Sequence, residues 1–188
     1  MQLNPHFLFN SLNTITVLVR DQRTEDASRM LELLSGVLRQ VLQSDKSQEV
    51  TLADELKFIE KYLAIEQVRF SDRLEINWSI DAAAGTALVP AFILQPLVEN
   101  AIRHGISRLS EAGLVEIAAS VSDNDILLSV KDNGPGYAAG PAGGVGLANT
   151  QARLETLFGD RARLDVRKLN GQGTVASVRL PLRRRIDG

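Results

Sequence analysis

Residues 132–149 decide the fold, because DNGPG (132–136) and GVGLAN (144–149) stand there with a glycine-rich segment between them. Six of the chain's fourteen glycines fall in residues 134–146, so this stretch is expected to be a loop. Asp132 follows an apolar strand pattern, and its carboxylate can accept a hydrogen bond from an exocyclic amine. Gly134 and Gly136 allow the backbone to approach a ligand closely. The competing interpretation is a plain turn, because Asp-Asn-Gly is also a common turn sequence.

The second motif, residues 144–149, opens a helix that is expected over 147–158. Free N–H groups at a helix N-terminus favour phosphate oxygens. The motif lacks the strand–turn–helix context and third glycine of a dinucleotide-binding fingerprint, and no Gly-Lys-Ser/Thr follows as in a Walker A loop. A flexible linker with a helix cap is the alternative. The candidate nucleotide-binding residues of this motif are Gly144, Gly146, Leu147 and Asn149.

Two further motifs flank this region. LQPLVENAIRHG (94–105) lies in a helix expected over Pro90–Leu109, where Asn100, Arg103 and His104 at i, i+3 and i+4 share one face. An amide oxygen is a suitable Mg²⁺ ligand, and arginine pairs with phosphate. The alternative is a helix with a solvated polar face. GQGT (171–174) predicts a tight turn before the last strand, and an ordinary hairpin turn would explain it equally well.

The order of these four motifs is more specific than any one of them. It resembles the nucleotide-binding fold shared by gyrase, Hsp90, histidine kinases and MutL. This resemblance implies an α+β sandwich that binds ATP with Mg²⁺. It also implies that Asn100 holds Mg²⁺, that Asp132 reads adenine, and that Thr174, next to Gly173, supports the adenine pocket through water.

The N-terminal segment selects among those families. QLNPHFLFNSLN (2–13) resembles the phosphoacceptor box of LytS-type sensor histidine kinases, and YLAIEQVRF (62–70) and residues 94–105 match the same family. The resemblance implies a dimeric protein-histidine kinase that phosphorylates its own His6. The phosphoryl group would then pass to an aspartate on the receiver domain of a response regulator. Neutral imidazole is a nucleophile near neutral pH, and Asn10, one helical turn on, is the candidate supporting residue.

Two positions depart from related families. Phe7 occupies the place where many histidine kinases carry an acidic residue, so the catalytic base is unassigned. Pro96 occupies the place of the catalytic glutamate of gyrase-type ATPases and cannot polarise a water, which disfavours hydrolysis by that route. Glu99 adjoins Asn100 but points about 100° away on an α-helix.

The apolar periodicity predicts the rest of the fold. Leu8, Leu12, Ile15 and Val19 form one helical stripe, a second follows over residues 30–41, and a third helix is expected over 52–70 behind a Thr51–Asp54 cap. Alternation predicts strands at 74–80, 115–121, 126–130, 164–166 and 175–180. We therefore expect an α+β chain: a helical dimerisation and phosphoacceptor region at 1–70, and an ATP-binding domain with a mixed, largely antiparallel sheet at 71–188.

Composition limits the remaining possibilities. The net charge of −2 gives no broad basic surface for nucleic acid, and with no cysteine the chain has neither disulfides nor thiolate metal sites. No apolar run is long enough to cross a membrane, so we expect a cytoplasmic fragment joined to the membrane only through a preceding N-terminal region. The alternative function is a catalytically silent dimerisation and nucleotide-sensing module. A protein-serine kinase or a gyrase-like ATPase on the same fold is more distant.

Overall fold

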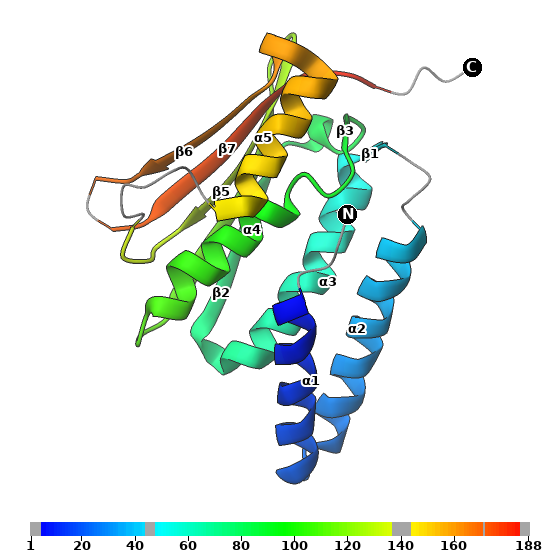
Figure 1. Ribbon diagram of the computed structural model, residues 1–188, viewed down its shortest axis with the longest axis vertical. Helices are drawn as coiled ribbons and strands as arrows, with labels where there is room; N and C mark the ends of the chain where they lie inside the picture. The colour runs from blue at the N-terminus through cyan, green and yellow to red at the C-terminus, as the bar shows by residue number, and fades with distance from the viewer. Residues whose placement is uncertain (1–4, 44–47, 137–143, 171, 185–188) are drawn as a thin grey trace.

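The computed structural model describes residues 5–43, 48–136, 144–170 and 172–184. Three long helices come first: α1 (Pro5–Arg20), α2 (Thr24–Gln43) and α3 (Leu52–Phe70). Figure 1 shows α3 running alongside a twisted sheet, with α1 and α2 packed on α3 and reaching beyond the sheet, while α4 and α5 lie against one face of the sheet. The chain is thus α+β, as the sequence predicts.

The three helices pack through a buried stripe on each. In α1 this stripe consists of Phe7, Ser11, Ile15 and Leu18. Ser11 is accommodated there because its hydroxyl donates to the carbonyl of Phe7 at 2.8 Å. The ring of Phe7 stacks on that of Tyr62 in α3, with centroids 4.5 Å apart. Phe7 therefore anchors α1 to α3.

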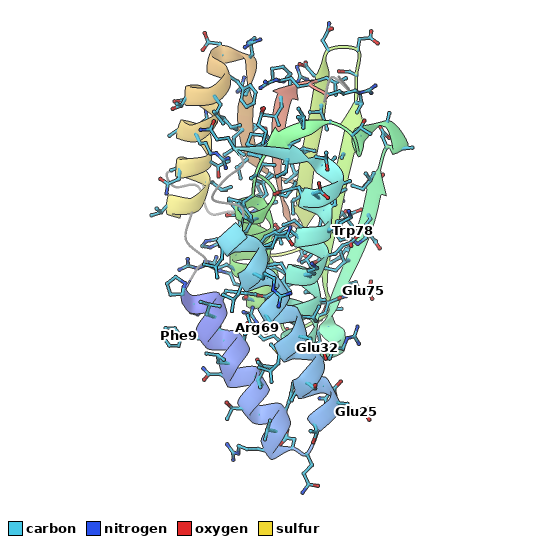
Figure 2. All side chains as sticks on the ribbon, turned by 90° about the vertical axis from the view of Figure 1, so that its right-hand side faces the viewer. Phe9, Glu25, Glu32, Arg69, Glu75 and Trp78 are labelled. Carbon is cyan, nitrogen blue, oxygen red and sulfur yellow. The ribbon has the colours of Figure 1, made fainter. Side chains whose placement is uncertain are left out.

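The apolar stripe predicted for α1 is not the face that packs within the chain. Of its four members only Ile15 is fully buried, whereas Leu12 and Val19 are 50% and 59% exposed. Phe9 is also exposed, and Figure 2 shows it projecting from α1 away from the rest of the chain. The helix has two apolar faces, so a spacing rule alone cannot tell which face the chain itself covers.

The third helix begins as predicted. Thr51 is its N-cap, with extended backbone, and its hydroxyl oxygen accepts the N–H of Asp54 at 3.2 Å. This cap places the start of α3 beside the short strand β1 (Glu49–Thr51), which pairs antiparallel with β3 (Leu88–Pro90). The pairing ties the helical part of the chain to the sheet-containing part.

The main sheet has the order β2-β4-β5-β7-β6. Its strands are β2 (Leu74–Ile80), β4 (Gly113–Val121), β5 (Asp125–Asp132), β6 (Arg163–Lys168) and β7 (Thr174–Pro181). Only the β2–β4 pair is parallel, which confirms a mixed, largely antiparallel sheet. Alternate residues of β4, β5 and β7 are buried, so one face packs on the helices.

The helix expected over Pro90–Leu109 is shorter and less regular than predicted. Pro90 ends β3, and α4 runs only from Gln95 to Asn100. A π-helical segment (Ala101–Gly105) and a 3₁₀ turn (Ile106–Arg108) follow it. Wide π turns are frequent at functional sites. The last helix, α5 (Gly144–Phe158), begins three residues before the predicted start at Leu147.

Among the described residues, no helix combines the length and the apolar character that a bilayer crossing requires.

Candidate functional site

A pocket of about 280 Å³ opens between α1, α3, the α4–π segment and the start of α5. We call it the His6 pocket. Asn100, Arg103 and His104 line it together, so the structure brings these three predicted residues to one place. Gly146 and Leu147 line the same pocket from α5. The motifs around residues 100 and 146, nearly fifty positions apart in the sequence, therefore face one cavity.

His6 lines this pocket from the first turn of α1. The amide nitrogen of Asn10 lies 3.2 Å from His6 Nδ1 and 3.4 Å from Nε2. An amide N–H donates only to a ring nitrogen without a proton, and either tautomer of His6 leaves one such nitrogen within reach of Asn10. The stack of Phe7 on Tyr62 fixes the turn that carries His6. The structure thus places Asn10 in contact with the His6 ring.

The helix α3 contributes three pocket residues that sequence reasoning did not single out: Tyr62, Glu66 and Arg69. Glu66 is 1% exposed, and Arg69 Nη2 lies 2.8 Å from its Oε2 as an ion pair. Burial, with a smaller contribution from Glu99, raises the pKa of Glu66 to about 7 against the opposing effects of Arg69 and the Tyr62 hydroxyl. Tyr62, Glu66 and Arg69 are spaced i, i+4 and i+7, which puts them on one otherwise apolar helix face. This spacing was the sequence signal that could have identified them as pocket residues.

Asn100 has a side chain and an environment that suit a magnesium ligand. It is 7% exposed, and its Oδ1 has no hydrogen-bond partner among the described residues. A buried, unsatisfied amide oxygen is costly unless something binds it. A hard cation that is also held by substrate phosphates needs few protein ligands. The residues present therefore fit Mg²⁺. Close by, burial lowers the pKa of His104, with a smaller contribution from Arg103 and Arg108.

Asp132 ends β5 and is 3% exposed. Its Oδ1 accepts the N–H of Gly134 at 2.9 Å. Burial raises its pKa, while backbone hydrogen bonds from Gly134 and Thr174 oppose that shift. Gly105, at the end of the π segment, approaches so closely that a Cβ on it would overlap the Asp132 carboxylate. A Cβ on Gly134 would overlap the backbone of Gly105. The two glycines therefore hold Asp132 against the segment that carries Asn100.

The remaining residues predicted for the site lie around Asn100 and Asp132. Thr174 opens β7, is buried, and pairs in register with Asp132. Gly136 and Gly173 both have positive φ, at 82° and 105°. Gly144 is the first residue of α5, whereas Asn149 lies exposed on α5 and does not line the His6 pocket. Residues 137–143, the centre of the predicted loop, and Gly171 of the GQGT motif lie outside the described part.

A second buried glutamate connects the elements that frame the pocket. Glu55 of α3 accepts the backbone N–H groups of Phe92 and Leu94 at 2.8 and 2.9 Å. Arg153 of α5 donates to the carbonyl of Ala91 at 2.6 Å. Burial raises the pKa of Glu55 to about 7 against these donors. Phe92 adopts φ of 60°, a strained conformation that the Glu55 contact holds in place.

Two family models match the chain. Residues 1–74 match the histidine kinase model, and residues 87–184 match the model of the histidine kinase-, DNA gyrase B- and HSP90-like ATPases. The chain is 40% identical over 183 residues to the sensor histidine kinase BtsS of Escherichia coli K12, which covers 97% of this chain and 32% of BtsS. It is 36% identical over 193 residues to the sensor protein LytS of Staphylococcus haemolyticus, covering 96% of this chain and 33% of LytS.

The chain thus spans about a third of the length of these relatives. Among solved structures, full-length ShkA in complex with AMPPNP superimposes with a TM-score of 0.55 at 21% identity, covering 88% of this chain and 40% of ShkA. That likeness concerns the fold alone. The chain belongs to the histidine kinase-, DNA gyrase B- and HSP90-like ATPases, and within them to the LytS-type sensor histidine kinases.

Proposed function

We propose that this chain is the ATP-binding and phosphoacceptor part of a two-component sensor kinase. It uses Mg-ATP to phosphorylate His6, and the phosphoryl group then passes to an aspartate of a response regulator. The observation that carries the proposal is that His6 lines one pocket with Asn100, Arg103 and Gly146 of the same chain. Nucleophile and phosphate-binding groups that share a cavity can bring the reacting atoms to near-attack distance, about 3–3.5 Å.

In this proposal each group has a separate role. The Asp132 carboxylate accepts a hydrogen bond from the exocyclic amine of adenine, and Thr174 supports the adenine pocket through water. Arg103 pairs with phosphate, and the N–H groups at the start of α5, from Gly144 onward, bind phosphate oxygens. His104 and Leu147 complete the wall of the pocket. Asn100 holds Mg²⁺, which neutralises phosphate charge when it is bound. Phosphoryl transfer depends mainly on such positioning and charge stabilisation.

The proposed division of labour places dimerisation and phosphoacceptance in residues 1–70 and nucleotide binding in residues 71–188. Phe9, Leu12 and Val19 are exposed on α1, and they form the surface that we assign to a second copy of the chain. The relatives BtsS and LytS are named as sensors, which supports our proposal that the reaction takes place on the cytoplasmic side of a membrane, where ATP and receiver domains are available.

The first experiment separates a kinase from a silent nucleotide-sensing module. Incubation with radiolabelled ATP and Mg²⁺ should give label that is lost in acid and survives base, which is the behaviour of phosphohistidine. A melting-temperature rise with Mg-ATP of roughly 5–10 °C is expected at 100 times the dissociation constant. Binding without label would identify the silent module. Label that survives acid would indicate a protein-serine kinase, and the absence of any melting shift would refute nucleotide binding itself.

A further inference from the structure

The proposed reaction needs a proton acceptor, and the residue after His6 cannot serve. When one ring nitrogen of His6 attacks phosphorus, the imidazole becomes cationic unless the other nitrogen gives up its proton. Phe7 has no polar atom, and its ring stacks on Tyr62. The amide of Asn10 contacts the imidazole but is not a base. A base must therefore come from another element of the pocket.

Two carboxylates line the His6 pocket: Glu66 of α3 and Glu99 of α4. Glu99 accepts the amide N–H of Gln95 at 2.7 Å and adjoins Asn100, which we assign to Mg²⁺. Glu66 faces the pocket from the α3 side, one helical turn beyond Tyr62, whose ring packs under the first turn of α1. Because Glu66 stands on the helix against which α1 packs, we take it as the partner of His6 and leave Glu99 to the nucleotide side of the pocket.

One oxygen of Glu66 is open to a new hydrogen bond. Oε2 is buried and accepts no hydrogen bond in the described chain, although Arg69 Nη2 lies 2.8 Å away as an ion pair. The pair thus compensates the charge of the carboxylate without occupying that oxygen in hydrogen-bond geometry. A buried acceptor left in this state gains free energy when a donor reaches it. An imidazole N–H is such a donor.

The electrostatic surroundings give this carboxylate the right basicity. Its pKa is raised to about 7, first by burial and then by Glu99, against Arg69 and Tyr62. The other charged or titratable groups on the pocket wall are His6, Arg103 and His104. A general base works best when its pKa lies near the operating pH.

We propose that Glu66 is the catalytic base of autophosphorylation, accepting the ring proton of His6 while the other ring nitrogen attacks the γ-phosphorus of ATP. The N–P bond forms as the bond between phosphorus and the bridging oxygen of ADP breaks. ADP leaves with that bonding pair, and the proton moves to Glu66 and then to water. This inference rests on the proposed function.

The test compares single-turnover autophosphorylation of the wild-type chain with that of Glu66→Gln, from about pH 5 to about pH 9. Glutamine keeps the size and an acceptor oxygen for Tyr62 but cannot take a proton. Above pH 7 the variant should be slower by about a hundredfold or more, with Mg-ATP binding unchanged. The rate of the wild-type chain divided by that of Glu66→Gln should fall as the pH drops through about 7. Below that pH Glu66 is protonated and, like glutamine, cannot accept a proton.

The matched control is Glu60→Gln, an exposed glutamate on the same helix that lies outside the pocket. It should label at the wild-type rate at every pH. Glu66→Asp retains an acid and should therefore keep a labelling rate that depends on pH. If the glutamine variant loses nucleotide binding, the test compares Glu66→Asp with Glu66→Ala among variants that still bind Mg-ATP. A Glu66→Gln rate equal to wild type, or a rate ratio that does not change with pH, would overturn the inference. A wild-type chain that never labels His6 would instead refute the proposed function.

Discussion

At the scale of single residues, the close contact between Gly105 and Asp132 gives the first prediction. Gly105→Ala places a methyl group where the Asp132 carboxylate lies, so either the carboxylate or the π segment must move. We expect the free energy of unfolding to fall by about 1–3 kcal/mol. We also expect the variant to lose most of the rise in melting temperature that Mg-ATP induces. Gly85→Ala is the control, because its methyl would meet Ala53 at an ordinary 3.9 Å. If the two variants bind nucleotide equally well, Asp132 does not depend on this contact.

The buried glutamates give a pH dependence of stability. Folding raises the pKa of Glu66 from 4.5 to about 7, so the folded chain holds that proton more tightly than the unfolded chain. As pH rises from about 4.5 to about 7, the unfolded chain releases the proton first, and about 3 kcal/mol of stability is lost. Glu55 acts in the same direction. The stability of wild type relative to Glu66→Gln, from melting curves, should therefore decline between pH 5 and pH 8. A constant difference would mean that the Glu66 pKa is not raised.

At the scale of elements, the two apolar faces of α1 predict a dimer contact. Leu12 is half exposed and lies on the same face of α1 as Val19. Val17 is equally exposed but lies about 140° from Leu12 around the helix axis. Leu12→Asp should shift the monomer–dimer equilibrium of the chain toward monomer in light scattering. Val17→Asp should leave that equilibrium unchanged. An equal response of the two variants would show that the α1 face carrying Leu12 is not the contact.

Helix α1 shows which features of the fold the sequence predicts and which it does not. Helices α1–α3, the strands of the main sheet and the Thr51 cap follow from local patterns, and the structure confirms them. The face that α1 buries does not follow, because Phe7 and Ser11 are selected by Tyr62 and by a backbone carbonyl. The strands β1 and β3 are three residues long and pair across about forty positions. Such partners depend on tertiary contacts, as does the π turn after Asn100.

For the candidate site, the motifs predicted His6, Asn100, Arg103, His104, Gly146 and Leu147, and the structure brings these residues into one pocket. Sequence reasoning missed Glu66, although it lies in a segment that matched the family. A glutamate inside a helix is usually solvent-exposed, and only the packing of α3 shows that this one is buried beside the pocket.

At the scale of the whole molecule, His6 lines the pocket formed by its own chain, so transfer within one chain is expected. Mixed dimers of a His6→Gln chain and an Asp132→Ala chain, distinguished by size tags, test this expectation. Neither chain then has both an acceptor and a nucleotide site, so no label should appear. Label on the Asp132→Ala chain would show transfer between chains and would mean that the two halves rearrange in the dimer.

The central claim, that His6 receives the γ-phosphoryl group of ATP, is tested most directly by locating the label. The chain has two histidines, His6 and His104, both of which line the same pocket. Mass spectrometry under basic conditions should find phosphate on His6 in the wild-type chain and in His104→Gln wherever that variant still binds nucleotide. His6→Gln should carry no acid-labile phosphate while retaining the Mg-ATP melting shift. Phosphate on His104, or acid-labile label that persists in His6→Gln, would contradict the account.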